Sequence, residues 1–139
     1  MWIMSKNALL LVIILLLTSS IFTSCEKGPD DLLTEHSWHG IVLDLVAEDG
    51  TVAYSYDLSN VELIFKDDGK FEVYHSEDLE NDGTWSYEEG DPDILLMKDN
   101  NDEEDEEYTV EELTEDNLTY YNEITVYGET YKYLYKYKK

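Results

Sequence analysis

The chain has 139 residues, of which 33 are acidic and 9 are lysine or arginine, and its formal net charge at pH 7 is −24. This balance excludes nucleic acid as an expected partner, because recognition of phosphates depends on basic side chains and the chain contains no arginine at all. It equally excludes attachment to an anionic lipid surface through charge.

The first 24 residues have the pattern of a secretory signal peptide. Lys6 is the only charged side chain before an unbroken run of ten apolar residues, from Ala8 to Leu17. A run of this length is too short for a membrane-spanning helix, which needs about 20 apolar residues. The small and polar residues from Thr18 to Ser24 indicate a cleavage region. We therefore expect residues 1–24 to be absent from the mature protein.

Cys25 is the only cysteine and cannot form an intramolecular disulfide. Phe22-Thr23-Ser24-Cys25 resembles the lipobox of bacterial lipoproteins, in which a signal peptidase cuts before the cysteine and the thiol carries a diacylglycerol. The resemblance implies cleavage between Ser24 and Cys25, acylation of Cys25 with fatty acids such as palmitate, and anchoring in the outer membrane through the N-terminal lipid. Display on the cell surface stays open, as does an ordinary secreted protein with a free cysteine near the cut.

Residues 25–36 are expected to form a flexible acidic tether. The stretch from Glu26 to Asp31 is polar, contains Gly28 and Pro29, and has no apolar periodicity. The folded domain is therefore predicted to span residues 37–139.

Alternation of apolar and polar residues with a period of two runs through this domain, as in Val52, Tyr54 and Tyr56 or in Trp85 and Tyr87. This period is typical of half-buried strands. Asp-Gly pairs at 49–50, 68–69 and 82–83 predict hairpin turns, because a type I′ turn favours these residues. The predicted strands are 37–47, 51–58, 60–66, 70–76, 83–88, 93–98, 107–113, 118–126 and 130–138.

Eight to nine short strands and no convincing helix predict an all-β fold, an antiparallel up-and-down meander of about one domain's length. Such a meander must protect its edge strands. Closure into a barrel needs only the sequential hairpins found here, so a barrel is favoured, and a two-sheet β-sandwich is the alternative.

Four motifs of the domain are Trp38 near the first strand, the segment from Phe65 to Phe71, Asp82-Gly83-Thr84-Trp85, and the segment from Leu113 to Leu118. Together they resemble the lipocalin-like lipoproteins of Bacteroidetes. The resemblance implies a lipocalin-like β-barrel and an apolar ligand cavity.

The candidate ligand-binding residues are aromatic side chains, since an apolar ring with a polar tip suits a cavity or a binding surface. On the last strand, four tyrosines fall on one face and three lysines with Leu134 on the other. The alternative is that the tyrosine face is simply core. The candidates are Trp38, Tyr54, Tyr56, Trp85, Tyr131, Tyr133 and Tyr135.

Calcium is the only metal or cofactor that the sequence suggests. Asp78, Glu80, Asp82 and Glu89 have the spacing of oxygen ligands in a calcium loop. The hairpin interpretation of Asp82-Gly83 is favoured over it. The segment 99–107, with seven carboxylates, is expected to be a solvated loop.

No motif for catalysis is recognisable, and the protein is not expected to be an enzyme. The favoured function is a lipid-anchored cell-envelope protein with a structural or interaction role, whose acidic surface contacts a cationic envelope protein. The alternative is a carrier that binds a small apolar or amphiphilic ligand inside the barrel. A filled or hollow barrel distinguishes the two.

Overall fold

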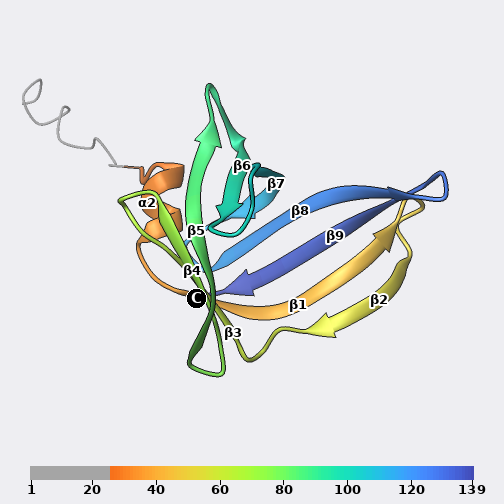
Figure 1. Cartoon of the computed structure of the whole chain (residues 1–139), viewed down its shortest axis with the longest axis horizontal. Helices are drawn as coiled ribbons and strands as arrows, with labels where there is room; N and C mark the ends of the chain where they lie inside the picture. Colours follow the sequence, from red (N-terminus) through yellow and green to blue (C-terminus); the bar gives the residue numbers. More distant parts are fainter. Residues whose placement is uncertain (1–25) are drawn as a thin grey trace, which may run out of the picture.

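The computed structural model describes residues 26–139 (Figure 1), and within them nine antiparallel strands follow one short helix. The predicted signal peptide and the lipid attachment at Cys25 fall outside the described residues. In the described part of the chain, no helix is long and apolar enough to cross a membrane. The elements are α2 (Pro29–Thr34), β1 (Trp38–Ala47), β2 (Val52–Asp57), β3 (Val61–Phe65), β4 (Lys70–His75), β5 (Asp78–Glu88), β6 (Asp91–Asp99), β7 (Glu106–Leu113), β8 (Asn117–Val126) and β9 (Glu129–Lys138).

Eight of the strands form a closed barrel. From β3 to β9 each strand pairs with its sequence neighbour, and β1 lies between β3 and β9. The β1–β9 pairing runs from His39 opposite Lys138 to Ala47 opposite Tyr131 and closes the sheet. The predicted all-β barrel is therefore confirmed, and the β-sandwich alternative is wrong.

Strand β2 is an extra strand outside the barrel. The edge of β1 that faces away from β9 pairs first with β3, at Trp38 and His39, and then with β2 from Val42 onward. Beyond the barrel rim, β8, β9, β1 and β2 continue as a four-stranded sheet, which we call the arm (residues 44–57 and 122–134), at the right of Figure 1. Every residue of β2 is exposed, because no layer covers this strand. The prediction that its alternating residues mark a half-buried strand is therefore wrong for β2.

The predicted hairpin at Asp82-Gly83 is wrong, since both residues lie inside the uninterrupted strand β5. The turn that precedes β5 uses Ser76 and Glu77, whose φ values are 50° and 74°. Gly83 is required for another reason: a Cβ there would lie 1.9 Å from the Lys98 carbonyl oxygen of β6. The glycine thus permits close approach of two strands instead of a turn.

Helix α2 closes one end of the barrel, so the prediction of a flexible tether does not hold for residues 29–34. Pro29 is at the start of the helix, where its missing N–H removes no hydrogen bond, and the Asp31 carboxylate accepts a hydrogen bond from the Gly28 N–H at 3.3 Å. The helix buries Leu33 completely. The Trp38 indole, also fully buried, donates a hydrogen bond to the Leu33 carbonyl at 3.0 Å.

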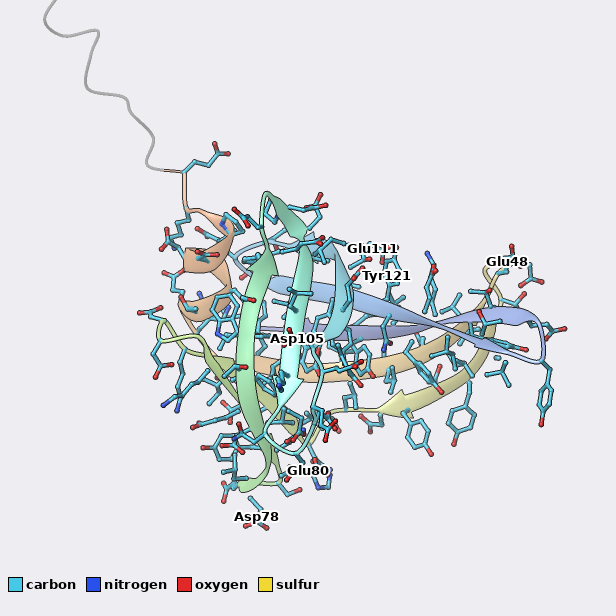
Figure 2. The ribbon with its side chains drawn as sticks, turned by 45° about the horizontal axis from the view of Figure 1, so that its top comes forward. Glu48, Asp78, Glu80, Asp105, Glu111 and Tyr121 are labelled. Atoms are coloured by element: carbon cyan, nitrogen blue, oxygen red, sulfur yellow. The ribbon has the colours of Figure 1, made fainter. Side chains whose placement is uncertain are left out.

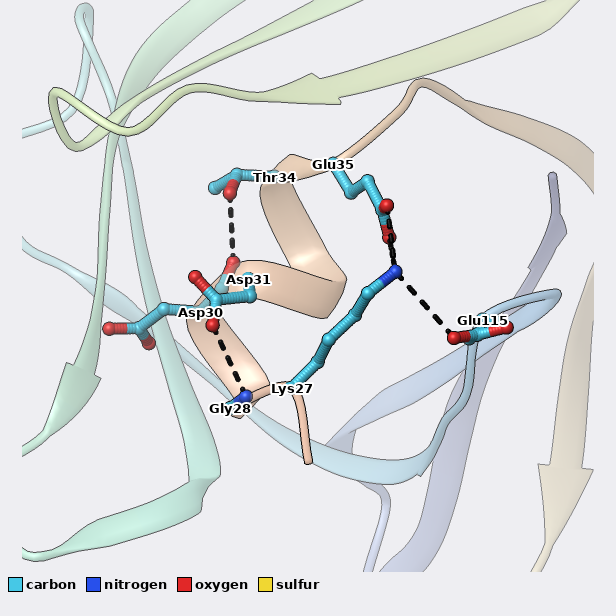
Figure 3. A network of polar contacts seen from close by, with 7 residues as sticks. All are labelled: Lys27, Gly28, Asp30, Asp31, Thr34, Glu35 and Glu115. Carbon is cyan, nitrogen blue, oxygen red and sulfur yellow. Dashed lines mark hydrogen bonds and ion pairs between the residues drawn. The ribbon is translucent and has the colours of Figure 1, made fainter. Parts of the chain in front are cut away.

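An ion-pair network holds the helix to the barrel at its surface (Figure 3). The Lys27 Nζ lies 2.6 Å from the Glu35 carboxylate and 3.5 Å from the Glu115 carboxylate in the β7–β8 turn. Because these groups are exposed, the ion pairs contribute little to stability, and the burial of Leu33 anchors α2 to the barrel.

Candidate ligand cavity

The barrel is hollow at the end opposite α2. Strand β5 runs from one end of the barrel to the other. Its Tyr87 hydroxyl lies 3.5 Å from the Pro29 carbonyl of helix α2, and its Glu80 lines the cavity at the opposite end. The cavity has a volume of about 360 Å³, which is within the size range of small-molecule sites. Its apolar wall is made by Leu58, Val61, Leu63, Phe71, Val73 and Met97.

Four tyrosines form an aromatic cluster in the same wall. The ring of Tyr120 lies 5.1 Å from those of Tyr108 and Tyr135 and 5.8 Å from that of Tyr137. Tyr108 stands edge-on to Tyr120, whereas Tyr135 and Tyr137 stack on it. These rings come from three adjacent strands, β7, β8 and β9, and their register places them on the inner face.

The cluster stays protonated at neutral pH. Burial raises the pKa of Tyr135 to about 12 and also raises the pKa values of Tyr108 and Tyr120, because a buried phenolate would lose its hydration. The Tyr120 hydroxyl is 3.4 Å from that of Tyr137, and the Tyr108 hydroxyl donates to the Glu106 carboxylate. The polar tips are thus partly satisfied within the protein, and the parts of the rings that line the cavity remain as contact surface.

The mouth of the cavity is acidic. Glu80 from β5, Asp99 from the end of β6, Asp102 from the β6–β7 loop and Glu106 from β7 line it together with Asn81. Figure 2 shows Glu80 near the lower end of β5, beside the loop that bears Asp105. Hydrogen bonds, chiefly from the Asn101 backbone N–H, hold the pKa of Asp99 below its ordinary value. No described residue that lines the cavity is basic.

Of the seven aromatic residues predicted to bind a ligand, only Tyr135 lines this cavity. Trp38 belongs to the closed end of the barrel, beneath α2. Trp85 also lies toward that end, where its indole donates to the Lys66 carbonyl at 3.0 Å and its ring packs edge-on against Phe65. Trp38 is therefore structural in this fold, whereas the half-buried Trp85 also lines a surface pocket of about 540 Å³ beside Pro29 and Tyr87.

The other predicted aromatic residues lie on the arm. Tyr54 and Tyr56 are 54% and 59% exposed, with their rings 4.8 Å apart. Tyr131 and Tyr133 of β9 pair with β1 and β8 beyond the last pairing between β7 and β8. All four are outside the cavity because their strands extend past the rim.

Three tyrosines of the cavity, Tyr108, Tyr120 and Tyr137, were not among the predicted ligand-binding residues. Tyr108 directly follows the acidic run, so the start of β7 cannot be recognised from the sequence. Tyr120 is followed by Tyr121, so the alternation of apolar and polar residues does not indicate which of the two rings points into the barrel. A prediction of strand register between β7, β8 and β9 would have grouped them with Tyr135.

The calcium-loop prediction is wrong in its geometry. Asp78, Glu80 and Asp82 lie along the extended strand β5, where alternate residues are about 7 Å apart and cannot wrap around one ion. Glu89 lies beyond the other end of that strand. Among residues 26–139, no group of three or more histidine, cysteine, aspartate or glutamate side chains is placed to hold a metal.

Comparison with known proteins places this barrel in a family. No curated protein matches the chain. A lipocalin-like protein from Bacteroides uniformis, solved as a crystal structure, aligns with 76% of this chain and 97% of its own length, at 18% identity and a TM-score of 0.49. The family model of the lipocalin-like domain matches residues 36–120. Members of that family are usually non-catalytic binding proteins. Since the match covers more than half of the chain, the protein belongs to the lipocalin-like domain family.

Proposed function

We propose that this protein is a lipid-anchored, non-catalytic binding protein of the cell envelope that carries a small apolar or amphiphilic molecule in its barrel. The observation that carries the proposal is the cavity of about 360 Å³ among core side chains. A structural role would need no such space, so the hollow end favours the carrier function over the structural or interaction role, which the sequence favoured because it shows no recognisable pocket motif.

The cavity offers the physical basis for binding. A ligand that enters it removes apolar surface from water, which contributes roughly 25 cal/mol for each Å² buried. The closed end of the barrel is filled by core side chains, among them the fully buried Leu33, Trp38 and Leu118, so the open space lies toward the other end.

A cavity-filling substitution tests the carrier function. Val73 lines the cavity and is half-buried, so the ring of Val73→Phe would occupy ligand space. We expect this variant to bind Nile red, a neutral apolar dye, at least about tenfold more weakly than the unchanged protein. Val126→Phe, on the arm at a position 42% exposed, is the matched control and should bind normally. Equal binding by all three proteins, or no binding at all, would overturn the proposal.

The lipid anchor is the second part of the proposal. It is supported by the apolar run from Ala8 to Leu17 and by Ser24-Cys25 at its polar end. Cys25→Ala should remain unacylated and leave the membrane fraction, whereas Ser19→Ala should be processed normally. If Cys25→Ala still matures and stays in the membrane fraction, the lipid anchor is wrong.

An interaction role is the second candidate function, favoured by the exposed carboxylates from Asp102 to Glu107, in the β6–β7 loop and at the start of β7. Their charge would attract a cationic envelope protein through a field that salt screens. Capture of such a partner should weaken strongly when the ionic strength rises from about 0.05 to 0.5 M. Salt-insensitive capture would count against this role.

A further inference from the structure

The charged groups that line the cavity are all negative, and its other polar groups are uncharged. This restricts the kind of molecule that can bind there. We propose that the ligand is an organic cation, with an apolar body in the barrel and an ammonium group between the tyrosine cluster and the acidic mouth. This inference rests on the proposed carrier function and adds the chemical class of the ligand. Two independent features of the cavity support it.

The first feature is the aromatic cluster. An aromatic ring carries negative potential on its face, and ammonium groups bind such faces, most strongly when water is excluded. Tyr108, Tyr120, Tyr135 and Tyr137 all line this one cavity, and the Tyr108 ring lies 5.1 Å from Tyr120 and 6.0 Å from Tyr135 at near-perpendicular angles. The rings pack edge to face at these distances, so a cation would contact the sides of the rings that line the cavity and not a space between them.

The second feature is the carboxylate group at the mouth. Glu80, Asp99, Asp102 and Glu106 come from three strands and a loop, and they converge on the same opening. An ammonium head at this opening would meet opposite charge, whereas a fatty-acid carboxylate would meet only like charge. The net charge of −24 would also raise the local concentration of cations around the protein.

Nearby lysines do not cancel this charge. Lys98 donates from its Nζ to the Glu103 backbone carbonyl at 2.9 Å and does not line the cavity. Lys66 pairs with Glu72, and Lys136 pairs with Asp44 at 2.9 Å; neither lines the cavity. The four mouth carboxylates have no lysine within ion-pair distance among the ion pairs of the described residues.

Three ligands with the same alkyl chain test the inference by calorimetric titration: octyltrimethylammonium and octanoate below their micelle concentrations, and octanol below its solubility limit. We expect the cation to bind at least about tenfold more tightly than the alcohol, and octanoate to bind most weakly. The preference for the cation should shrink as salt is added, since part of it is exposed charge attraction.

A pair of charge-matched variants separates the mouth from the overall charge. The mouth variant carries Glu80→Gln, Asp99→Asn, Asp102→Asn and Glu106→Gln. The control variant carries Glu48→Gln, Glu88→Gln, Glu89→Gln and Glu111→Gln, four exposed positions outside the cavity lining. Both lose four negative charges, but only the mouth variant should lose the preference for the cation over octanol.

The outcomes distinguish this inference from the function on which it rests. Equal affinity for the cation and the alcohol would overturn cation selectivity while leaving the carrier function intact. Equal loss of preference in both variants would assign selectivity to net charge and overturn the role of the mouth. Failure of all three ligands and of Nile red to bind would overturn the carrier function itself.

Discussion

Replacing Leu33 with alanine is expected to lower the free energy of unfolding by about 2 to 5 kcal/mol. Leu33 is fully buried, although it lies on a helix of only six residues. The substitution removes three methylene-sized groups, worth about 0.8 kcal/mol each, or about 2.4 kcal/mol in total. The cavity left between α2 and the barrel floor adds to this value, because the strands around Trp38 cannot collapse into it.

Leu32→Ala is the matched control on the same helix. Leu32 is only half-buried and borders a surface groove beside Val110, so its loss should cost less than about 1 kcal/mol. Urea unfolding followed by the fluorescence of Trp38 and Trp85 measures both variants. If Leu33→Ala costs no more than Leu32→Ala, helix α2 does not dock on the barrel and residues 25–36 are a tether after all.

Three further substitutions test other parts of the structure. Gly83→Ala should lower the free energy of unfolding by about 1 to 3 kcal/mol, measured by urea unfolding, because its Cβ would collide with the Lys98 carbonyl. Hydrogen bonds from Ser55 and Lys136 lower the pKa of Asp44, so the stability it contributes is present above about pH 4 and is lost as pH falls further. Asp44→Asn should flatten that acid limb in a series of unfolding curves. Burial lowers the pKa of His36, whose two ring nitrogens are buried and have no hydrogen-bond partner among residues 26–139, so stability should decrease as pH falls below about 6.5. His36→Gln should show less of this decrease between pH 7 and pH 5.

The strands were predictable because the alternation of apolar and polar residues with a period of two can be recognised in a single sequence. Each of the nine predicted strands exists, and the largest error in length is in β5, which begins at Asp78 instead of residue 83. Asp82-Gly83 misled the prediction because turn chemistry and close strand packing both select glycine. Local sequence cannot distinguish the two, since the deciding atom is the Lys98 carbonyl on the next strand.

Helix α2 was missed because six residues are too few to show a helical period. Pro29 with Asp30 and Asp31 is a helix-start signal, but it also fits an acidic linker. Only the burial of Leu33 against the barrel decides between them, and that contact is tertiary.

The cavity was predictable in kind but not in composition. Alternation on β9 correctly put Tyr131, Tyr133 and Tyr135 on one face, yet only Tyr135 lies inside the barrel. The barrel rim falls between Tyr133 and Tyr135 because β7 pairs with β8 only as far as Tyr121. This limit depends on pairing between strands, which the local sequence pattern does not reveal.

The most direct test of a ligand site inside the barrel is the position of a bound ligand by nuclear magnetic resonance. Intermolecular nuclear Overhauser effects should connect the methyl groups of octyltrimethylammonium to the ring protons of Tyr108, Tyr120 and Tyr135. Contacts confined to Tyr54 and Tyr56 on the arm would contradict the account, because the ligand would then bind outside the cavity.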